Sequence, residues 1–224
     1  TSKGALGPVT NIDLAVNAML EERLLAARPA YGWLSEESPD DHSRRIGHHR
    51  VFMLDPIDGT AALIAKTPQF TISIGVIEDG GAFAGAIYNP MTDEMFVGAP
   101  GVGMRLNGRR VQASLRDTLE GARLVGQKSR FADAKWKLPW PKLDITGRQS
   151  IAYRMATVAA GQADATILFG FKNEWDIAAG AALVEAAGGI VSDLWGEPLA
   201  FNQPDPRAPG AAASGAPLHP LIIE

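Results

Sequence analysis

The sequence predicts a mixed α/β fold in which an antiparallel meander comes first and alternating helices and strands follow. Residues 71–97 hold three short strand-like segments, separated by Glu78-Asp79-Gly80-Gly81 and by Asn89-Pro90, which are typical turn sequences. Further along, helical and strand-like segments alternate from residue 150 to residue 194. Strands followed by alternating helix and strand indicate α+β and then α/β, packed in layers.

The first expected element is a helix over residues 11–28, which Pro29 ends. Several of its apolar residues fall roughly on one side, which we expect to face the core: Leu14, Ala18, Leu20, Leu24 and Leu25. A polar loop and the apolar segment 51–54, interpreted as a buried strand, come next. The loop carries the basic clusters Arg44-Arg45 and His48-His49-Arg50, which we interpret as solvated rather than as a substrate-facing patch.

In the second half, the helices are expected over residues 150–160 and 175–187, the latter capped by Gly188-Gly189. The expected strands are 122–127, 163–169 and 190–194, and residues 129–145 are interpreted as irregular. The tail from 203 to 217 is rich in Pro, Gly and Ala, which is typical of a loop. Length and composition favour a single domain over residues 1–224, with lobes at roughly 1–116 and 117–224.

Composition narrows the classes of function. With 46% hydrophobic and 21% charged residues, the chain is typical of a globular protein. Its net charge is −4, so it lacks the excess of basic residues that is expected of a protein that binds DNA or RNA. The absence of cysteine excludes disulfides, zinc–thiolate sites and a cysteine nucleophile. No apolar run approaches the ~20 residues that span a bilayer, and no signal peptide is visible, so we expect no membrane partner and a cytoplasmic location. The chain opens at Thr1 rather than at a methionine, which leaves open whether a segment precedes it.

The most informative stretch is the acidic turn Leu54-Asp55-Pro56-Ile57-Asp58-Gly59-Thr60. It follows an apolar strand, and the carboxyl ends of strands commonly carry ligand sites. Two carboxylates this close are costly unless a cation lies between them. Mg²⁺ suits them because it takes oxygen ligands and shares them with phosphate groups. The backbone N–H groups of Gly59 and Thr60 then suit a phosphate.

Three further acidic positions could join this turn. Asp13 and Asp176 both lie where a helix begins, so each also has the simpler interpretation of a helix cap or first-turn acid. Glu36, followed by a second glutamate, comes after the apolar pair Trp33-Leu34, although adjacent acids in a loop are usually solvated. Spacing along the chain does not show that these residues converge.

Three motifs in order carry a resemblance to a known family. Asp55-Pro56-Ile57-Asp58-Gly59-Thr60 is preceded by Glu36-Glu37 and followed by Trp175-Asp176-Ile177-Ala178-Ala179-Gly180 with Glu185-Ala186-Ala187-Gly188-Gly189. This combination resembles the inositol monophosphatase superfamily, which includes 3'(2'),5'-bisphosphate nucleotidases. The resemblance covers nearly the whole chain and implies a layered αβαβα sandwich.

The resemblance also implies a role for individual residues. The implied ligands of two or three Mg²⁺ ions are Glu36, Asp55, Asp58, Asp176 and the carbonyl of Ile57. Asp13 and Thr60 are expected to activate water and, together with Glu36, form the expected catalytic set. The expected substrate-binding residues are Gly59, Thr60, Lys3 and Lys172. The implied partner is a small phosphorylated metabolite, and family members are often homodimers.

Departures from the family pattern guide the choice of substrate. No acid stands near Leu168-Phe169, where inositol monophosphatases carry the glutamate that contacts inositol, and Phe171 adds to an apolar approach. Aromatic faces stack on bases, and Lys172 offers charge to a second phosphate, so we expect a 3'(2'),5'-bisphosphate nucleotidase, with an inositol-1-monophosphatase as the alternative.

Two rival classes are less favoured. Haloacid-dehalogenase phosphatases also use an Asp-containing turn, but their two aspartates lie two residues apart, whereas Asp55 and Asp58 lie three apart. A non-enzymatic metal-binding or sugar-phosphate-binding relative is less favoured because Asp13 and Thr60 are both present.

Overall fold

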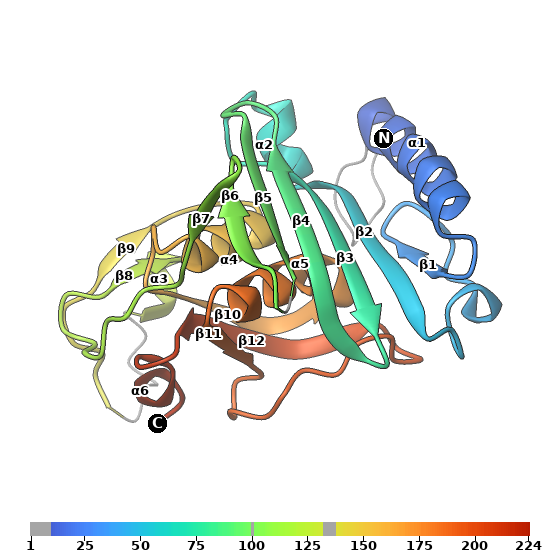
Figure 1. Cartoon of the computed structure of the whole chain (residues 1–224). Helices are drawn as coiled ribbons and strands as arrows, with labels where there is room; N and C mark the ends of the chain where they lie inside the picture. Colours follow the sequence, from blue (N-terminus) through green and yellow to red (C-terminus); the bar gives the residue numbers. More distant parts are fainter. Residues whose placement is uncertain (1–9, 100, 132–137) are drawn as a thin grey trace.

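Two β-sheets with helices between and outside them make up the molecule (Figure 1). The computed structural model describes residues 10–99, 101–131 and 138–224. Helices α4 (Ile151–Ala159) and α5 (Glu174–Ala186) lie between the sheets, α1 (Asn11–Ala27) covers the outer face of the first sheet, and α6 (His219–Ile223) packs outside the second. The expected αβαβα layering is therefore confirmed.

The first sheet has seven strands in chain order, β1 to β7. They are β1 (Gly32–Ser35), β2 (Arg50–Asp58), β3 (Thr71–Glu78), β4 (Gly81–Asn89), β5 (Glu94–Ala99), β6 (Gly103–Leu106) and β7 (Arg109–Val111). All pairs are antiparallel except β1 with β2, so the predicted meander is confirmed. The hairpin of β6 and β7 was not predicted, although Asn107-Gly108, with φ angles of 48° and 78°, is a recognisable turn signal.

The second sheet has five strands in the order β11-β12-β10-β8-β9. They are β8 (Arg123–Val125), β9 (Asp144–Thr146), β10 (Ala165–Asn173), β11 (Gly189–Ser192) and β12 (Arg207–Gly215). The prediction of a loop over residues 203–217 is wrong, because β12 lies between β10 and β11 and pairs with both. The predicted lobe division, near residue 116, falls between β7 and β8 and stays a prediction. Three short helices complete the part of the chain that the structure describes: η2 (His42–Arg44), α2 (Thr60–Ile64) and α3 (Lys128–Phe131).

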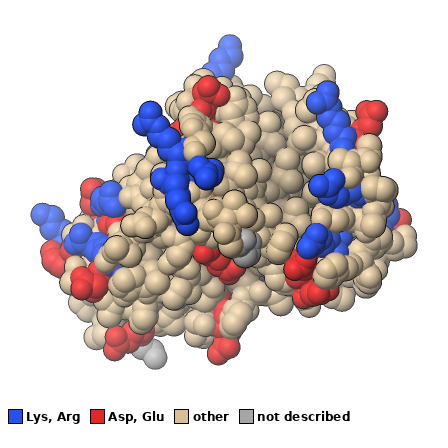
Figure 2. All heavy atoms as spheres, in the orientation of Figure 1, with Lys and Arg blue, Asp and Glu red and all other residues tan. Residues whose placement is uncertain are grey.

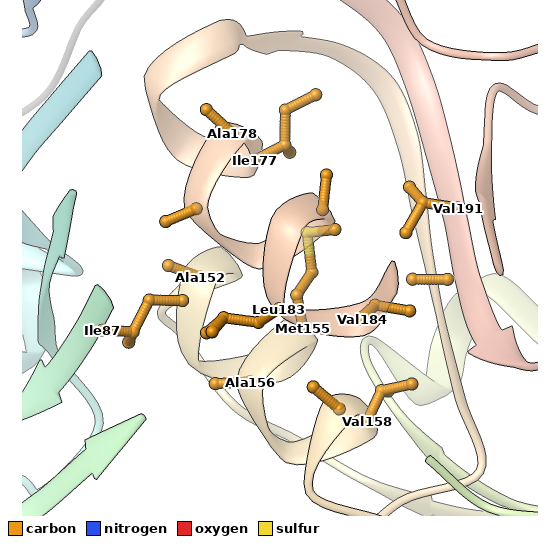
Figure 3. Packing of buried hydrophobic residues seen from close by; sticks show 14 of the residues in the cluster. Ile87, Ala152, Met155, Ala156, Val158, Ile177, Ala178, Leu183, Val184 and Val191 are labelled. Carbon is orange, nitrogen blue, oxygen red and sulfur yellow. The ribbon is translucent and has the colours of Figure 1, made fainter. Parts of the chain in front are cut away.

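The core lies around α4 and α5. Every residue of α5 from Ile177 to Val184 is buried, which suits a helix that lies between two sheets. Figure 3 shows Met155 on α4 and Leu183 and Val184 on α5 pointing into this packing. The first sheet approaches α5 closely because Gly85 on β4 faces this helix. A Cβ added at Gly85 would stand 2.3 Å from the carbonyl oxygen of Ala179. This close contact fixes the position of α5, and α5 carries Asp176.

Helix α1 differs from its predicted orientation. Its buried residues are Asp13 and Asn17, whereas Leu14 is 49% exposed. Leu20, Leu24 and Leu25 do pack against the sheet, as expected. Near its start, the inner face of α1 is polar because Asn17 accepts a hydrogen bond from Ser35 Oγ (2.6 Å) and Asp13 reaches Thr60, so hydrogen bonds replace apolar contacts there. None of the described helices has the length and apolarity needed to cross a membrane.

Candidate active site

The acidic turn lies within the last residues of β2 rather than after it. Asp55 and Asp58 belong to the strand and are only 2% and 7% exposed, so the predicted end at Leu54 is too early. The ladder with β3 shifts register between these two aspartates, which marks an irregularity of the β-bulge kind. Asp55 Oδ1 accepts the N–H of Ile57 (3.0 Å), which folds the turn back on itself.

Asp58 is held by the start of α4. Its Oδ2 accepts hydrogen bonds from Ser150 Oγ (2.6 Å) and from the N–H of Ala152. Ser150 is also the N-cap of α4 and accepts the N–H of Tyr153 at 2.9 Å. One serine therefore joins the helix to the acidic turn, and no sequence motif marks this serine as part of the site.

Thr60 and Asp13 meet although 47 positions separate them. Thr60 Oγ1 lies 3.1 Å from Asp13 Oδ1 and 3.2 Å from the carbonyl oxygen of Ile57. Gly59 precedes Thr60 with a φ of 97°, a left-handed conformation that glycine adopts without strain. Asp13 also forms the capping box of α1 with Thr10, which confirms its structural interpretation, and its catalytic role stays a prediction.

Glu36 and Asp176 are partly exposed, whereas Asp55 and Asp58 are buried. The N–H of Glu36 donates to the carbonyl oxygen of Leu54 (3.1 Å), which places this residue beside the end of β2. Asp176 is in the first turn of α5, and its Oδ2 accepts the N–H of Asn173 at 3.2 Å. Asp176 is thus not the N-cap itself but the third residue of the helix, and it forms a capping box with the N-cap Asn173.

The four carboxylates share one electrostatic neighbourhood. Burial raises the pKa of Asp55 well above its usual value, and the negative charges of Asp58, Glu36 and Asp176 raise it further. Burial also raises the pKa of Asp176, again with Asp58 and Glu36 contributing. The pKa of Asp58 is raised by burial, although its hydrogen bonds from Ser150 and Ala152 oppose the shift.

Such a cluster fits Mg²⁺. Its donors are hard carboxylate and carbonyl oxygens, and a divalent cation would offset the repulsion that raises these pKa values. In the described part of the chain, no three Asp, Glu or His side chains form a group that could hold one ion by themselves. Mg²⁺ commonly takes one or two protein carboxylates and completes its shell with water and phosphate oxygens, so this donor set is sufficient.

Comparison with known proteins assigns the family. The model of the inositol monophosphatase family matches residues 1–224. The chain belongs to the inositol monophosphatase family. That family is one of phosphatases, which agrees with the acidic site described above.

Relatives in this family have several names. The chain is 32% identical over 206 residues to the Nus factor SuhB of Salmonella typhimurium, covering 88% of this chain and 75% of that protein. It is 33% identical over 204 residues to the 3'(2'),5'-bisphosphate nucleotidase CysQ of Escherichia coli, covering 90% and 82%.

Solved structures agree with the fold. The suhB protein of Bartonella henselae superposes with a TM-score of 0.82 at 28% identity, over 100% of this chain and 86% of that chain. The inositol monophosphatase of Anabaena gives a TM-score of 0.76 at 27% identity, over 94% and 82%.

The predicted substrate-binding lysines and the predicted apolar approach have different outcomes. Lys172 lies near enough to Asp176 for its charge to lower the pKa of that acid, and its role in substrate binding stays a prediction. Lys3 falls outside the described residues. The ammonium group of Lys172 donates to the carbonyl oxygens of Phe169, Gly170 and Phe171, at 2.8, 3.1 and 3.0 Å. Leu168, expected to line the approach to the site, is only 1% exposed and belongs to the core.

The basic loop is largely solvated, as interpreted, with Arg44 and His49 exposed, but Arg45 is an exception. Arg45 is fully buried and pairs with Asp40, with Nε 2.6 Å from Oδ1. It also donates to the carbonyl oxygens of Gln203 (2.8 Å) and Pro204 (3.2 Å). Next to it, Glu174 at the start of α5 accepts the N–H groups of Asn202 and Gln203. This network anchors the segment that leads into β12 against the helix that carries Asp176.

Proposed function

We propose that the chain is a Mg²⁺-dependent phosphomonoesterase that hydrolyses a small phosphorylated metabolite with activated water. The observation that carries this proposal is the contact of Thr60 with Asp13 beside the carboxylate cluster. Phosphoryl transfer depends on positioning and on neutralisation of charge more than on covalent chemistry, and these residues supply both.

Different residues would bind the cations and the phosphate. Glu36, Asp55, Asp58, Asp176 and the carbonyl of Ile57 would hold the cations. Bound Mg²⁺ supplies charge neutralisation, a lowered pKa for bound water and stabilisation of the leaving oxygen. The N–H groups of Gly59 and Thr60 would donate to the phosphate.

Thr60 and Asp13 provide the route for the proton. The Thr60 hydroxyl can accept a hydrogen bond from the attacking water while it donates to Asp13 Oδ1, 3.1 Å away. As the water oxygen bonds to phosphorus, its proton moves towards this pair, and the phosphorus–oxygen bond to the leaving group breaks. No enzyme nucleophile is needed.

For the substrate, we propose a nucleoside 3'(2'),5'-bisphosphate. The aromatic side chains of Phe131, Phe169 and Trp140 form a cluster, with the ring centre of Phe131 5.9 Å from that of Phe169 and 5.4 Å from that of Trp140. Phe169 belongs to β10, which leads directly into α5 and Asp176. Aromatic groups of this kind favour a base over a polyol, and the similarity to CysQ points the same way. Inositol 1-phosphate is the second candidate, favoured by the family to which the chain belongs.

The test of the chemistry is Asp55→Asn. Removing this charge should lower kcat by at least ~10²-fold, the scale of losing a group that stabilises the transition state. Because the pKa of Asp55 is raised by burial, the variant should melt at the same or a higher temperature than the wild type in EDTA, which separates lost catalysis from lost folding. Asp117→Asn, at an exposed position, is the matched control. Full turnover by Asp55→Asn, or wild-type activity in EDTA, would contradict the proposal.

A further inference from the structure

Arg45 is a buried arginine outside the carboxylate cluster. Figure 2 shows Lys and Arg side chains gathered at the surface over β6 and β7, where Arg105, Arg109 and Arg110 are exposed. The side chain of Arg45 instead has no exposed surface. Burial removes the hydration of a charged group, so it is costly unless the group is paired and hydrogen-bonded. The contacts of Arg45 should therefore explain why it is buried.

The hydrogen-bond donors of this guanidinium all have acceptors. Nε and one terminal nitrogen donate to the two carboxylate oxygens of Asp40, at 2.6 and 2.7 Å, which is a bidentate pair. The other N–H groups donate to the side-chain oxygen of Asn202 (3.1 Å) and to the carbonyl oxygens of Gln203 (2.8 Å) and Pro204 (3.2 Å). Since each of the guanidinium N–H groups has its own acceptor, the group is held in one orientation.

One side of this network belongs to the loop that carries Glu36. Asp40 follows Glu36 in the same loop, between β1 and η2. The backbone of Arg45 also packs against β1, since a Cβ at Gly32 would stand 3.0 Å from the Cα of Arg45. Glu36 directly follows β1. Arg45 therefore contacts the chain on both sides of Glu36.

The other side of the network belongs to the helix that carries Asp176. Glu174, the first residue of α5, is buried and accepts the N–H groups of Asn202 (2.6 Å) and Gln203 (3.1 Å). Its own N–H donates to the carbonyl oxygen of Pro206 (2.9 Å). The first turn of α5 is thus fixed to the same segment that accepts hydrogen bonds from the guanidinium.

We propose that Arg45 is a positioning residue, which holds Glu36 and Asp176 in the relative position that cation binding requires. The inference rests on the proposed function, in which both carboxylates bind cations. These two acids are partly exposed and come from different elements, so their geometry depends on the segments that support them. Arg45 acts through those segments and not on the cation itself.

The first test is Arg45→Met, which keeps an unbranched side chain and removes every N–H donor. The dissociation constant for Mg²⁺ should rise about 10-fold or more, the usual scale for residues that support the ligands of a metal. Titration calorimetry measures this binding without substrate. In saturating Mg²⁺, kcat should recover most of its wild-type value, because the bound cation then holds the two acids.

The direction of the change separates positioning from net charge. Loss of a positive charge should by itself strengthen Mg²⁺ binding, because the cation is then repelled less. A weaker affinity therefore does not come from the lost charge. Arg44→Met is the matched control, since it removes the same charge from the neighbouring residue, whose side chain is 41% exposed and pairs with Glu21. Its affinity for Mg²⁺ should equal that of the wild type or be slightly higher.

A milder variant tests the same network. Asp40→Asn keeps the shape of the side chain and weakens the bidentate pair with Arg45. Its control is Asp41→Asn, because the side chain of Asp41 caps η2 and accepts the N–H of Ser43. Both variants remove one negative charge, so a weaker Mg²⁺ affinity in Asp40→Asn than in Asp41→Asn reports the network. This pair decides the question if Arg45→Met does not fold.

Hydrogen exchange in EDTA gives a measurement that does not need the cation. The amides of Glu174, Asn202 and Gln203 should exchange faster in Arg45→Met than in the wild type, because the segment that joins them has lost its support. The amides of β5 should not change. Melting curves in EDTA check that each variant is folded.

The outcomes separate this inference from the proposed function. Wild-type Mg²⁺ affinity in Arg45→Met and Asp40→Asn would overturn the inference and leave the phosphatase intact, whatever happens to the melting temperature. Absence of Mg²⁺ binding by the wild type would overturn the proposed function and, with it, the role of Arg45.

Discussion

Thr60 stands between the carboxylate cluster and Asp13, which gives it a role that can be separated from metal binding. Thr60→Ala removes the hydroxyl that contacts Asp13 Oδ1 and leaves all four carboxylates in place. We expect kcat to fall by ~10²-fold, the usual scale for a proton-transfer group, and the affinity for Mg²⁺ to stay nearly unchanged. Steady-state kinetics and titration calorimetry measure the two quantities.

Thr60→Ser is the matched control because it keeps the hydroxyl, and it should recover most of the activity. If Mg²⁺ binding disappears together with activity in Thr60→Ala, the hydroxyl has a structural role in the turn, and its assignment to water activation is wrong.

At the scale of single residues, the sequence predicts a contact when the residues that form it are close together in the chain. Asp55 and Asp58 were found from their spacing, because both lie in one turn. The contact of Asp13 with Thr60 crosses 47 positions and was reached only through the family resemblance. Arg45 was misread because a charged residue in a polar stretch usually faces water, and its partner Asn202 lies 157 positions away.

Among the elements, the contact between β4 and α5 leaves no room for a side chain at Gly85. Gly85→Ala would place a Cβ 2.3 Å from the carbonyl oxygen of Ala179, and backbone atoms cannot move aside as a flexible side chain can. We expect the free energy of unfolding to fall by roughly 1–3 kcal/mol or more, the usual cost of overpacking. Urea denaturation followed by circular dichroism measures it.

Gly81→Ala provides the comparison, since it begins the same strand and its Cβ would meet its nearest neighbour, the carbonyl oxygen of Glu78, at an ordinary 3.5 Å. Its stability should change by less than about 0.5 kcal/mol. Equal losses in the two variants would show that the approach of α5 is not what requires glycine at position 85.

The sequence predicts an element well when its apolar residues recur at a regular spacing or when a capping residue marks its start. The strands of the meander are examples of the first case, and the helix that begins after Ser150 is an example of the second. β12 was missed because its centre is Ala211-Ala212-Ala213, small residues typical of loops as well as of crowded strands. These side chains are small because both faces of the strand are buried and both edges are paired. Because these contacts come from the tertiary structure, they produce no alternation of apolar and polar residues that would identify the strand in the sequence.

For the molecule as a whole, the buried carboxylates should make stability depend on pH and on Mg²⁺ together. An acid with a raised folded-state pKa binds its proton more tightly when folded, so stability falls as pH rises from about 4, the usual carboxyl value, towards the raised pKa. Burial raises the pKa of Asp55, Asp176 and Glu174, that of Glu174 to about 7. In EDTA, these groups should therefore make the protein less stable at pH 7 than at pH 5.

Mg²⁺ should reverse this trend because it replaces the protons at Asp55 and Asp176. The rise in melting temperature caused by Mg²⁺ should be larger at pH 7 than at pH 5, as differential scanning fluorimetry would show. Burial lowers the pKa of His219, so this group makes the protein more stable as pH rises. Its contribution is the same with and without Mg²⁺ and therefore cancels in the rise in melting temperature that Mg²⁺ causes. A Mg²⁺ effect independent of pH would argue against the carboxylate cluster as the binding site.

The position of β12 has a consequence for the order in which the nascent chain can fold. β10 pairs with β8 in a single register position, Ala165 with Leu124, whereas it pairs with β12 along most of its length. The first sheet is complete once residue 111 has left the ribosome, but the second cannot close until about a hundred more residues have followed, at ~5–20 residues per second. For several seconds of synthesis, β10 and β11 have open edges, and a second nascent chain could pair with them before β12 does.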